Sequence, residues 1–121
     1  MKKDERIHKT IGTAMDVHSI MGPGRLEAVY HEALEIEFDL RRVSYVSKPR
    51  VDIEYKDYKL KSYYIPDFLV LNEVVVEIKA ESALTKVDEA QIINRLKCCG
   101  KKVGLLINFG ESSLRWKRFV N

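Results

Sequence analysis

The residues best suited to chemistry are two carboxylates and a lysine that lie in consecutive apolar runs. Asp67 follows Pro66, and Glu77 and Lys79 belong to the apolar segment 74–80. Burying a carboxylate and an ammonium inside a strand costs several kcal/mol per ion unless the groups are paired or bind a ligand. Because side chains alternate along a strand, Glu77 and Lys79 share one face. This combination indicates chemistry on phosphate.

The turn between the two runs decides whether the carboxylates can act together. The polar break at Asn72-Glu73 predicts a β-hairpin. A two-residue loop at this break would pair Asp67 with Ile78 and place the carboxylates on opposite faces of the sheet. A three-residue loop over 71–73, with Asn72 as the residue most tolerant of positive φ, would pair Asp67 with Glu77. A shared metal site requires the second register or an equivalent bulge.

Two motifs resemble those of a known nuclease superfamily. Pro66-Asp67 followed by Glu77-Ile78-Lys79 resembles the signature of the PD-(D/E)XK nuclease superfamily. Upstream, the segment 24–30, with the sequence GRLEAVY, looks like the GxxExxY motif that names a small family within that superfamily. Neither motif carries a substitution, and the resemblance extends over roughly residues 5–120. It implies a restriction-endonuclease-like core with the element order αβββαβ.

The resemblance also implies a divalent-metal site with oxygen ligands. Asp67 and Glu77 would bind Mg²⁺, or Mn²⁺ in its place, together with the main-chain carbonyl of Ile78. Glu27 of the GxxExxY-like segment would add an acidic ligand, directly or through water. Mg²⁺ suits these groups because it is a hard ion, held by one or two carboxylates, waters and substrate phosphate oxygens.

Lys79 and Gln91 complete the catalytic set that the resemblance implies. Lys79 would orient or deprotonate a water that Mg²⁺ activates. Gln91, on the helix after the active strand, would support that water or a phosphate. Other interpretations stay open: Glu77 and Lys79 could neutralise each other at a solvated end of the sheet, and Asp67 could cap a turn. Gln91 could equally be a solvated helix position.

Basic residues indicate where a nucleic acid could bind. The net charge of +3 permits such a partner without requiring it. The candidate contacts lie in the second motif, the third helix and its following loop, and the C-terminus: Tyr30, Arg95, Lys97, Lys101, Lys102, Arg115, Lys117 and Arg118. Trp116 and Phe119 interleave with the last three and could stack bases. Solvated charge is the alternative for the basic clusters, and core packing is the alternative for Tyr30.

Several other functions are disfavoured. The sequence has no Gly-rich phosphate loop and no dinucleotide fingerprint, which counts against nucleotide hydrolysis and redox catalysis. His8, His18 and His31 share no zinc-binding spacing, and the adjacent cysteines Cys98-Cys99 favour reduced thiols over a disulfide. No apolar run reaches the length of a membrane span, and the N-terminal charges precede no apolar segment. We expect a cytoplasmic protein without a membrane partner.

The elements that must position these residues follow from apolar spacing. With 121 residues, 45% of them hydrophobic, the chain is expected to form one domain over 1–121. The pattern predicts an α+β (α/β) fold with a mixed sheet, helices on its faces and an extra N-terminal helix. Helices are expected over 5–21, from 24 to 40 and from 86 to 99. A meander of four or five strands is expected between the second and third helices. After the third helix, we expect a strand over 102–109, parallel to the Glu77 strand, and an edge strand over 114–120.

The apolar stripes of the helices are also predicted. In the second helix, Leu26, Tyr30, Leu34 and Leu40 are expected to face the sheet. In the third helix the expected stripe is Val87, Ala90, Ile93 and Leu96, and Thr85 with Asp88 resembles an N-cap pair.

The function expected from these features is a Mg²⁺-dependent nuclease that hydrolyses phosphodiester bonds, with DNA as the preferred substrate. Two alternatives remain. The first is a non-cleaving module on the same fold that binds nucleic acid or a protein. The second is a homodimeric, structure-specific endonuclease for branched DNA, because small members of the superfamily often act as dimers.

Overall fold

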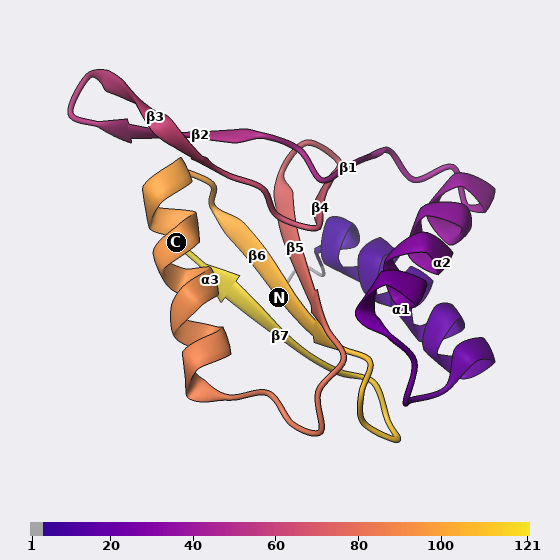
Figure 1. Ribbon diagram of the computed structural model, residues 1–121. Coiled ribbons are helices and arrows are strands. Elements are labelled where there is room, and N and C mark those ends of the chain that lie inside the picture. The colour runs from indigo at the N-terminus through magenta and orange to yellow at the C-terminus, as the bar shows by residue number, and fades with distance from the viewer. Residues whose placement is uncertain (1–3) are drawn as a thin grey trace.

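The protein forms a five-stranded sheet with helices on both faces (Figure 1). The structure is a computed structural model, and it describes residues 4–121. In chain order the elements are α1 (Glu5–Met21), α2 (Glu27–Leu40), β1 (Tyr45–Ser47), β2 (Val51–Tyr55), β3 (Tyr58–Tyr64), β4 (Phe68–Val70), β5 (Val74–Lys79), α3 (Lys86–Cys99), β6 (Val103–Asn108) and β7 (Arg115–Val120). No helix in this described part of the chain is long and apolar enough to cross a membrane.

The main sheet has the strand order β1-β4-β5-β6-β7. β5 and β6 are parallel, as expected for strands joined by a helical crossover, and the other neighbours are antiparallel. The prediction of a mixed sheet with helices packed on its faces is therefore confirmed, and so is the edge position of β7.

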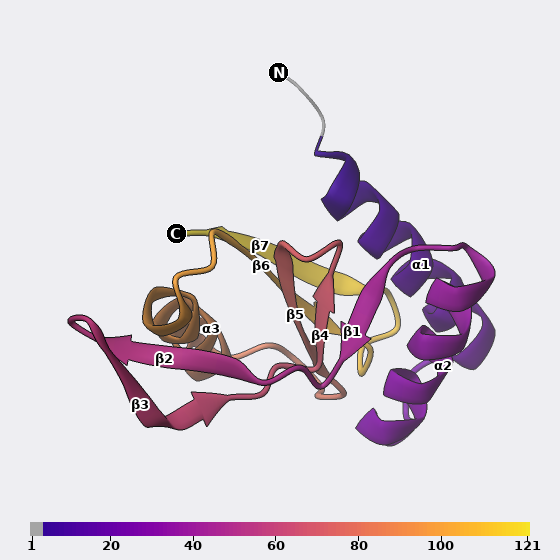
Figure 2. The ribbon, with the colours of Figure 1, turned by 90° about the horizontal axis from the view of Figure 1, so that it is seen from above.

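The predicted meander is wrong, because β2 and β3 leave the main sheet. Within residues 4–121 they pair with each other as a separate two-stranded hairpin, which lies on the α3 side of the sheet (Figure 2). The physical reason is their one-sided apolar pattern. Val51 and Tyr64 pack against Ile92 and Leu96 of α3, while most other side chains of the hairpin are exposed. A strand with one short apolar face cannot fill a sheet that is covered on both sides.

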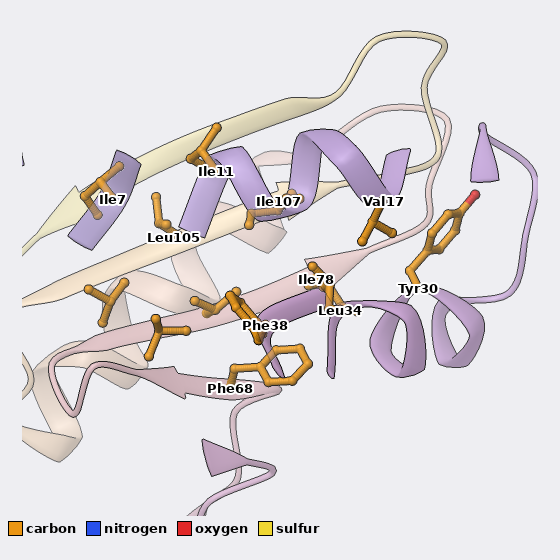
Figure 3. Close-up of a cluster of buried hydrophobic side chains, with 14 of the residues drawn as sticks. Ile7, Ile11, Val17, Tyr30, Leu34, Phe38, Phe68, Ile78, Leu105 and Ile107 are labelled. Atoms are coloured by element: carbon orange, nitrogen blue, oxygen red, sulfur yellow. The ribbon is translucent and has the colours of Figure 1, made fainter. Parts of the chain in front are cut away.

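The larger core lies between the sheet and the helix pair α1–α2 (Figure 3). Its helical side chains include Ile7, Ile11, Val17, Leu34 and Phe38, and the sheet contributes Phe68, Ile78, Leu105 and Ile107. Two predicted members of the α2 stripe are corrected: Leu26 is 77% exposed and Leu40 is 72% exposed. Leu26 has an extended backbone at the N-cap, and Leu40 is the last helical residue, so both lie beyond the length of helix that faces the sheet.

The smaller core lies on the α3 face of the sheet. Ile92 and Leu96 are buried against strand residues such as Val75 and Leu106. The predicted α3 stripe is therefore wrong at Val87 and Ile93, which are exposed, because α3 buries a narrow i, i+4 stripe. The helix begins with a complete capping box, in which Asp88 takes the place usually held by Glu or Gln.

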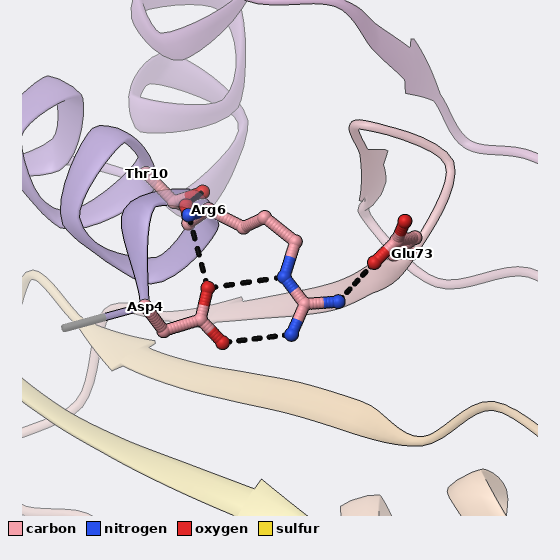
Figure 4. A network of polar contacts seen from close by, with 4 residues as sticks. All are labelled: Asp4, Arg6, Thr10 and Glu73. Carbon is pink, nitrogen blue, oxygen red and sulfur yellow. Dashed lines mark hydrogen bonds and ion pairs between the residues drawn. The ribbon is translucent and has the colours of Figure 1, made fainter. Parts of the chain in front are cut away.

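The start of α1 is fixed to the β4–β5 turn by one arginine (Figure 4). Asp4 caps the helix, accepting a hydrogen bond from the Arg6 amide at 3.0 Å. Its carboxylate also accepts two bonds from the Arg6 guanidinium, at 3.0 and 2.7 Å, and Arg6 pairs with Glu73 in the turn. The side-chain hydrogen bond from Arg6 lowers the pKa of Asp4 to about 2.

The β4–β5 turn has the three-residue form that a shared carboxylate site requires. Val70 pairs with Val74 and Phe68 with Val76, which places Asp67 opposite Glu77. The loop 71–73 lies between the strands, so of the two registers that the sequence left open, the structure has the one that a shared carboxylate site requires. Asn72 has a φ of 59°, and Leu71 has a φ of 53° that the sequence pattern did not anticipate.

Candidate active site

Asp67 and Glu77 are joined by reciprocal hydrogen bonds at the point where β4 begins and β5 approaches its end. The Asp67 amide donates to Glu77 Oε1 at 3.1 Å, and the Ile78 amide donates to Asp67 Oδ2 at 2.8 Å. Each carboxylate therefore gives one oxygen to the other strand and retains one oxygen for another partner. The pairing that the sequence left open between two registers is the one that brings the acids together.

The second oxygens of the two carboxylates have different partners. Oδ1 of Asp67 lies 3.5 Å from His31 Nδ1 of α2, on the side of the larger core. Oε2 of Glu77 accepts a hydrogen bond from Arg95 Nη1 of α3 at 2.5 Å, on the opposite side. The pair thus connects the two helical layers of the molecule.

A cleft of about 180 Å³ opens beside Asp67. It is lined by Glu27, Ala28, His31, Lys48 and Asp67. Burial and the negative charge of Asp67 raise the pKa of Glu27, while Lys79 and His31 oppose this effect. Glu27, assigned from the GxxExxY-like segment, therefore lies close enough to Asp67 for the two charges to interact.

The segment before Glu27 is held in place by the other residues of its motif. Gly24 has a φ of 92°, a conformation that favours glycine. The Tyr30 hydroxyl donates to the Gly22 carbonyl at 2.5 Å and accepts from the Arg25 amide at 3.1 Å. Glycine and tyrosine thus fix the loop from which α2 presents Glu27.

Tyr30 itself is not a surface residue. Its side chain is fully buried and stacks on Phe109, with ring centroids 4.7 Å apart. The candidate role of Tyr30 in binding nucleic acid is therefore wrong, and the alternative of core packing is the correct one.

His31 and Lys48 are cleft residues that the sequence did not assign to the site. His31 Nε2 lies 2.7 Å from the Ser47 hydroxyl, and its ring stacks on Phe68. Lys48 donates its amide to the Asp67 carbonyl at 2.8 Å, with a φ of 49°. His31 lies one helical turn after Glu27, a spacing that brings it near the site, whereas no local pattern identifies Lys48, which reaches the cleft through the path of the chain after β1.

Glu77 is surrounded by Tyr64 and Arg95. The residue is 7% exposed, and burial raises the pKa of its carboxyl group. Tyr64 lies near enough to oppose that rise, yet its buried hydroxyl makes no hydrogen bond of normal geometry with any described residue. The Arg95 guanidinium lies 4.9 Å from the centre of the Tyr64 ring and supplies the positive charge that a buried carboxylate needs.

The side chains of Lys79 and Glu77 both reach residues of α3. Its Nζ lies 3.9 Å from Asp88 Oδ1, in the first turn of α3. Gln91 occupies the next turn and is exposed, and its side chain makes no hydrogen bond within residues 4–121. Because residues 88, 91 and 95 lie at helical spacing on one side of α3, Gln91 stands between the partners of Lys79 and Glu77.

The loop after Lys79 is fixed by a buried asparagine at the end of β6. The side-chain amide of Asn108 bonds the Glu81 amide and carbonyl at 3.0 Å each, and its oxygen also accepts from the Gly110 amide at 3.1 Å. Asn108 is fully buried. A Cβ atom added at Gly110 would lie 2.1 Å from the Glu81 carbonyl oxygen, so the two loops approach closely.

The oxygen groups present fit a hard divalent cation by chemistry. Because the Ile78 amide points towards Asp67, its carbonyl points to the same side of β5. With Asp67, Glu77 and Glu27 it forms a set of the ligands that Mg²⁺ prefers. No group of three His, Cys, Asp or Glu side chains in the described chain is already arranged around a common point. Glu77 would have to turn away from Arg95 for both carboxylates to face one cation.

The other basic candidates lie at the end of α3, in the loop after it and on β7. Lys97, Lys101 and Lys102 are near the start of β6, whereas Lys79 pairs in register with Asn108 at its end. On β7, Arg115 is exposed and lies opposite Asn108, while Lys117 bonds Glu89 at 2.6 Å and Arg118 lines a separate groove with α1. Their role in binding nucleic acid stays a prediction.

Comparison with known families gives a result that agrees with this site. The site has a carboxylate pair, a lysine two residues after Glu77 and a mixed sheet that carries them. No curated protein matches the chain. The family model of the PD-(D/E)XK nuclease superfamily matches residues 4–119, which is nearly the entire chain. The protein therefore belongs to the PD-(D/E)XK nuclease superfamily.

Proposed function

We propose that the protein is a metal-dependent nuclease that hydrolyses phosphodiester bonds, with DNA as its preferred substrate and residues 1–121 as one catalytic domain. The observation that carries the proposal is the reciprocal bonding of Asp67 and Glu77, which brings two carboxylates together beside Lys79. Within the superfamily we assign the chain to the GxxExxY family, on the support that Gly24 and Tyr30 give to the loop before Glu27.

The proposed cation is Mg²⁺, with Mn²⁺ as a substitute. Asp67, Glu77 and the Ile78 carbonyl would hold it, and Glu27 would contribute across the cleft. When bound, the ion would polarise the phosphate and lower the pKa of a water molecule. The remaining work falls to the protein side chains, which must orient the reacting groups and balance charge.

Lys79 is the proposed group for the attacking water. It would hold or accept the proton of that water and offset the negative charge that develops on the phosphate. Asp88 positions the Lys79 ammonium from the capped start of α3. Gln91, exposed in the next turn, is free to bond the water or a phosphate oxygen.

His31 and Lys48 are proposed as supporting residues of the cleft. His31 would hold the Asp67 carboxylate in position through the contact at Nδ1, while its other nitrogen is fixed by Ser47. Lys48 would bring a positive charge to the side of the cleft that faces Glu27 and Asp67, where a substrate phosphate has to enter.

Cleavage of a substrate panel tests the proposal. The purified protein is incubated with supercoiled, linear, single-stranded and four-way-junction DNA and with RNA, in Mg²⁺, Mn²⁺ or EDTA. We expect cutting of DNA that requires the metal, and a loss of about a hundredfold or more in Glu77→Gln and in Lys79→Ala. Glu32→Gln is the matched control, because Glu32 is an exposed carboxylate on α2 and lies outside the cleft.

The panel also separates the alternatives. A preference for junctions over linear duplex would favour a structure-specific enzyme, and light scattering would then show whether it is a dimer. Metal binding without cutting of any substrate would contradict the nuclease and favour a non-cleaving module. Cutting that persists in Glu77→Gln would contradict the assignment of the site.

A further inference from the structure

We propose that Arg95 couples metal binding to nucleic-acid binding: it neutralises Glu77 in the metal-free protein and contacts a substrate phosphate once a divalent cation has taken that carboxylate. This inference rests on the proposed nuclease function and assigns a specific residue to substrate binding at the same site. Its starting observation is the hydrogen-bonded ion pair between Arg95 Nη1 and Glu77 Oε2, at 2.5 Å.

The two partners of this ion pair differ in their exposure. The Glu77 side chain is 9% exposed, whereas the Arg95 side chain is 40% exposed. A buried carboxylate without a counter-charge is strongly unfavourable, so Glu77 needs a cation whenever its carboxyl group is ionised. A partly exposed guanidinium can be solvated when it leaves. The Glu77 carboxylate can therefore exchange one cation for another, and Arg95 is the partner that can depart.

A metal ion and Arg95 compete for the same oxygen. Glu77 Oε1 already accepts a hydrogen bond from the Asp67 amide, so Oε2 is the oxygen that would bind a cation with both of its lone pairs free once Arg95 has left. Arg95 holds that oxygen. Binding of Mg²⁺ must therefore displace the guanidinium, and part of the affinity for the metal is spent on breaking the ion pair.

The released guanidinium lies on the α3 side of the site, next to the groups proposed to act on the attacking water and the phosphate. Arg95 is on the same side of α3 as the exposed Gln91 and as Asp88, the partner of Lys79. Its ring partner Tyr64 is held in the smaller core, which keeps the stem of Arg95 close to Glu77. A planar guanidinium binds a phosphate through two parallel hydrogen bonds, which makes a phosphate the natural second partner.

A simple structural role for the ion pair does not account for its position. The start of α3 is fixed by its capping box, and the helix is packed on the sheet through Ile92 and Leu96. The ion pair thus adds little to the placement of the helix but controls the charge of a proposed metal ligand. By linkage, a metal that releases Arg95 must tighten phosphate binding, and a bound phosphate must tighten metal binding by the same factor.

The first test measures metal affinity without any nucleic acid. Titration calorimetry with Mg²⁺ compares the wild type with Arg95→Gln and with Arg95→Lys. We expect Arg95→Gln to bind Mg²⁺ about tenfold more tightly, because the competing cation is gone, and Arg95→Lys to stay near the wild-type affinity. Arg41→Gln is the matched control, since Arg41 forms an exposed ion pair with Glu37 on α2, and it should leave the affinity unchanged.

The second test measures the coupling itself. In a Lys79→Ala background, which prevents cutting, the affinity for a labelled duplex is measured by fluorescence anisotropy with and without Mg²⁺. We expect Mg²⁺ to tighten binding about tenfold when Arg95 is present and about twofold or less in the Arg95→Gln background. Thermal unfolding of each variant confirms that the fold is retained.

The outcomes distinguish this inference from the proposed function. If the wild type cuts DNA with Mg²⁺ but Arg95→Gln binds the metal no more tightly, the competition is overturned and the nuclease stands. If the gain in duplex affinity is equal with and without Arg95, the phosphate contact is overturned. If neither the wild type nor Arg95→Gln binds Mg²⁺ or Mn²⁺, both this inference and the proposed function fail.

Discussion

Asp67 and Glu77 show how two acidic residues can be fixed by each other's backbone. Each receives a hydrogen bond from an amide of the opposite strand, so neither carboxylate can rotate freely. The remaining oxygens point to His31 and Arg95, one on each helical layer. Each carboxylate is thus held through one oxygen, while the partner of its other oxygen can be exchanged, as the proposed binding of a metal and a phosphate requires.

At the same scale, the Tyr64 hydroxyl gives a test of the environment of Glu77. Because this hydroxyl is buried and has no hydrogen-bond partner among residues 4–121, Tyr64→Phe should leave the free energy of unfolding unchanged or raise it by up to about 1 kcal/mol. Tyr30→Phe is the matched comparison: its hydroxyl makes two hydrogen bonds, so we expect a loss of about 1 kcal/mol. Urea denaturation measures both. An equal loss in the two variants would show that Tyr64 is bonded to Glu77.

At the scale of elements, local sequence patterns predicted where helices begin and end, but not how a helix is rotated about its own axis. The helix over 5–21 was predicted with its observed bounds, because its apolar spacing is closed by Gly22 and Pro23. The pairing of Asp67 with Glu77 was left open, because it depends on whether the turn holds two or three residues. The Arg95–Glu77 ion pair could not be predicted, since it depends on how α3 is rotated about its axis, a property set by packing against β6 and β2.

The hairpin β2–β3 shows the same limit. Its strands were predicted, but their sheet was not, because alternation within a strand does not reveal which partner the strand will pair with. Lys48, in the loop between β1 and β2, has no local sequence pattern that assigns it to the site. Its place in the cleft with Asp67 follows from the turn of the chain out of the main sheet.

The start of α1 predicts a dependence of stability on acid. Ordinary aspartate has a pKa of 3.8, and the bonds from Arg6 lower that of Asp4 to about 2 in the folded protein. The unfolded chain therefore binds the proton first as the pH falls, so this contribution is present above pH 3.8 and is lost as the pH falls through 2. Asp4→Asn keeps a capping side chain without the charge.

Measurement of the free energy of unfolding from pH 6 to pH 2 checks this expectation. The wild type should be more stable than Asp4→Asn at the upper end, and the difference should shrink towards the acid end. Tyr30→Phe serves as the comparison: it should cost about 1 kcal/mol with little dependence on pH over this range, because its hydroxyl bonds only neutral backbone groups. If the free energies of unfolding of the wild type and Asp4→Asn differed by the same amount from pH 6 to pH 2, the ion pair between Asp4 and Arg6 would not stabilise the folded protein.

At the scale of the whole molecule, the end of the sheet that carries Lys79 is closed by the contact between two loops. A Cβ atom at Gly110 would lie 2.1 Å from the Glu81 carbonyl oxygen, so Gly110→Ala must move one loop. We expect a loss of about 3 kcal/mol in the free energy of unfolding. Gly12→Ala is the control, because its Cβ would meet only the Arg41 side chain at 3.4 Å within α1. It should be neutral or stabilise by about 0.5 kcal/mol.

Denaturant unfolding of both variants gives the comparison. If Gly110→Ala, like Gly12→Ala, left the free energy of unfolding nearly unchanged, the loop after β5 could move without cost. In that case the position of Lys79 would depend on β5 alone and not on the buried Asn108 that joins the loops.

The parallel pairing of β5 with β6 has a consequence for folding during synthesis of the protein. Glu77 and Lys79 lie on β5, yet the strand beside it is synthesised only after the whole of α3, at Val103–Asn108. Pairings between distant segments form late and slowly. A chain emerging from the ribosome therefore carries both acids of the proposed site long before it carries their support. The proposed site is therefore assembled only after residues 103–108 have left the ribosome, about a whole helix later than its two carboxylates.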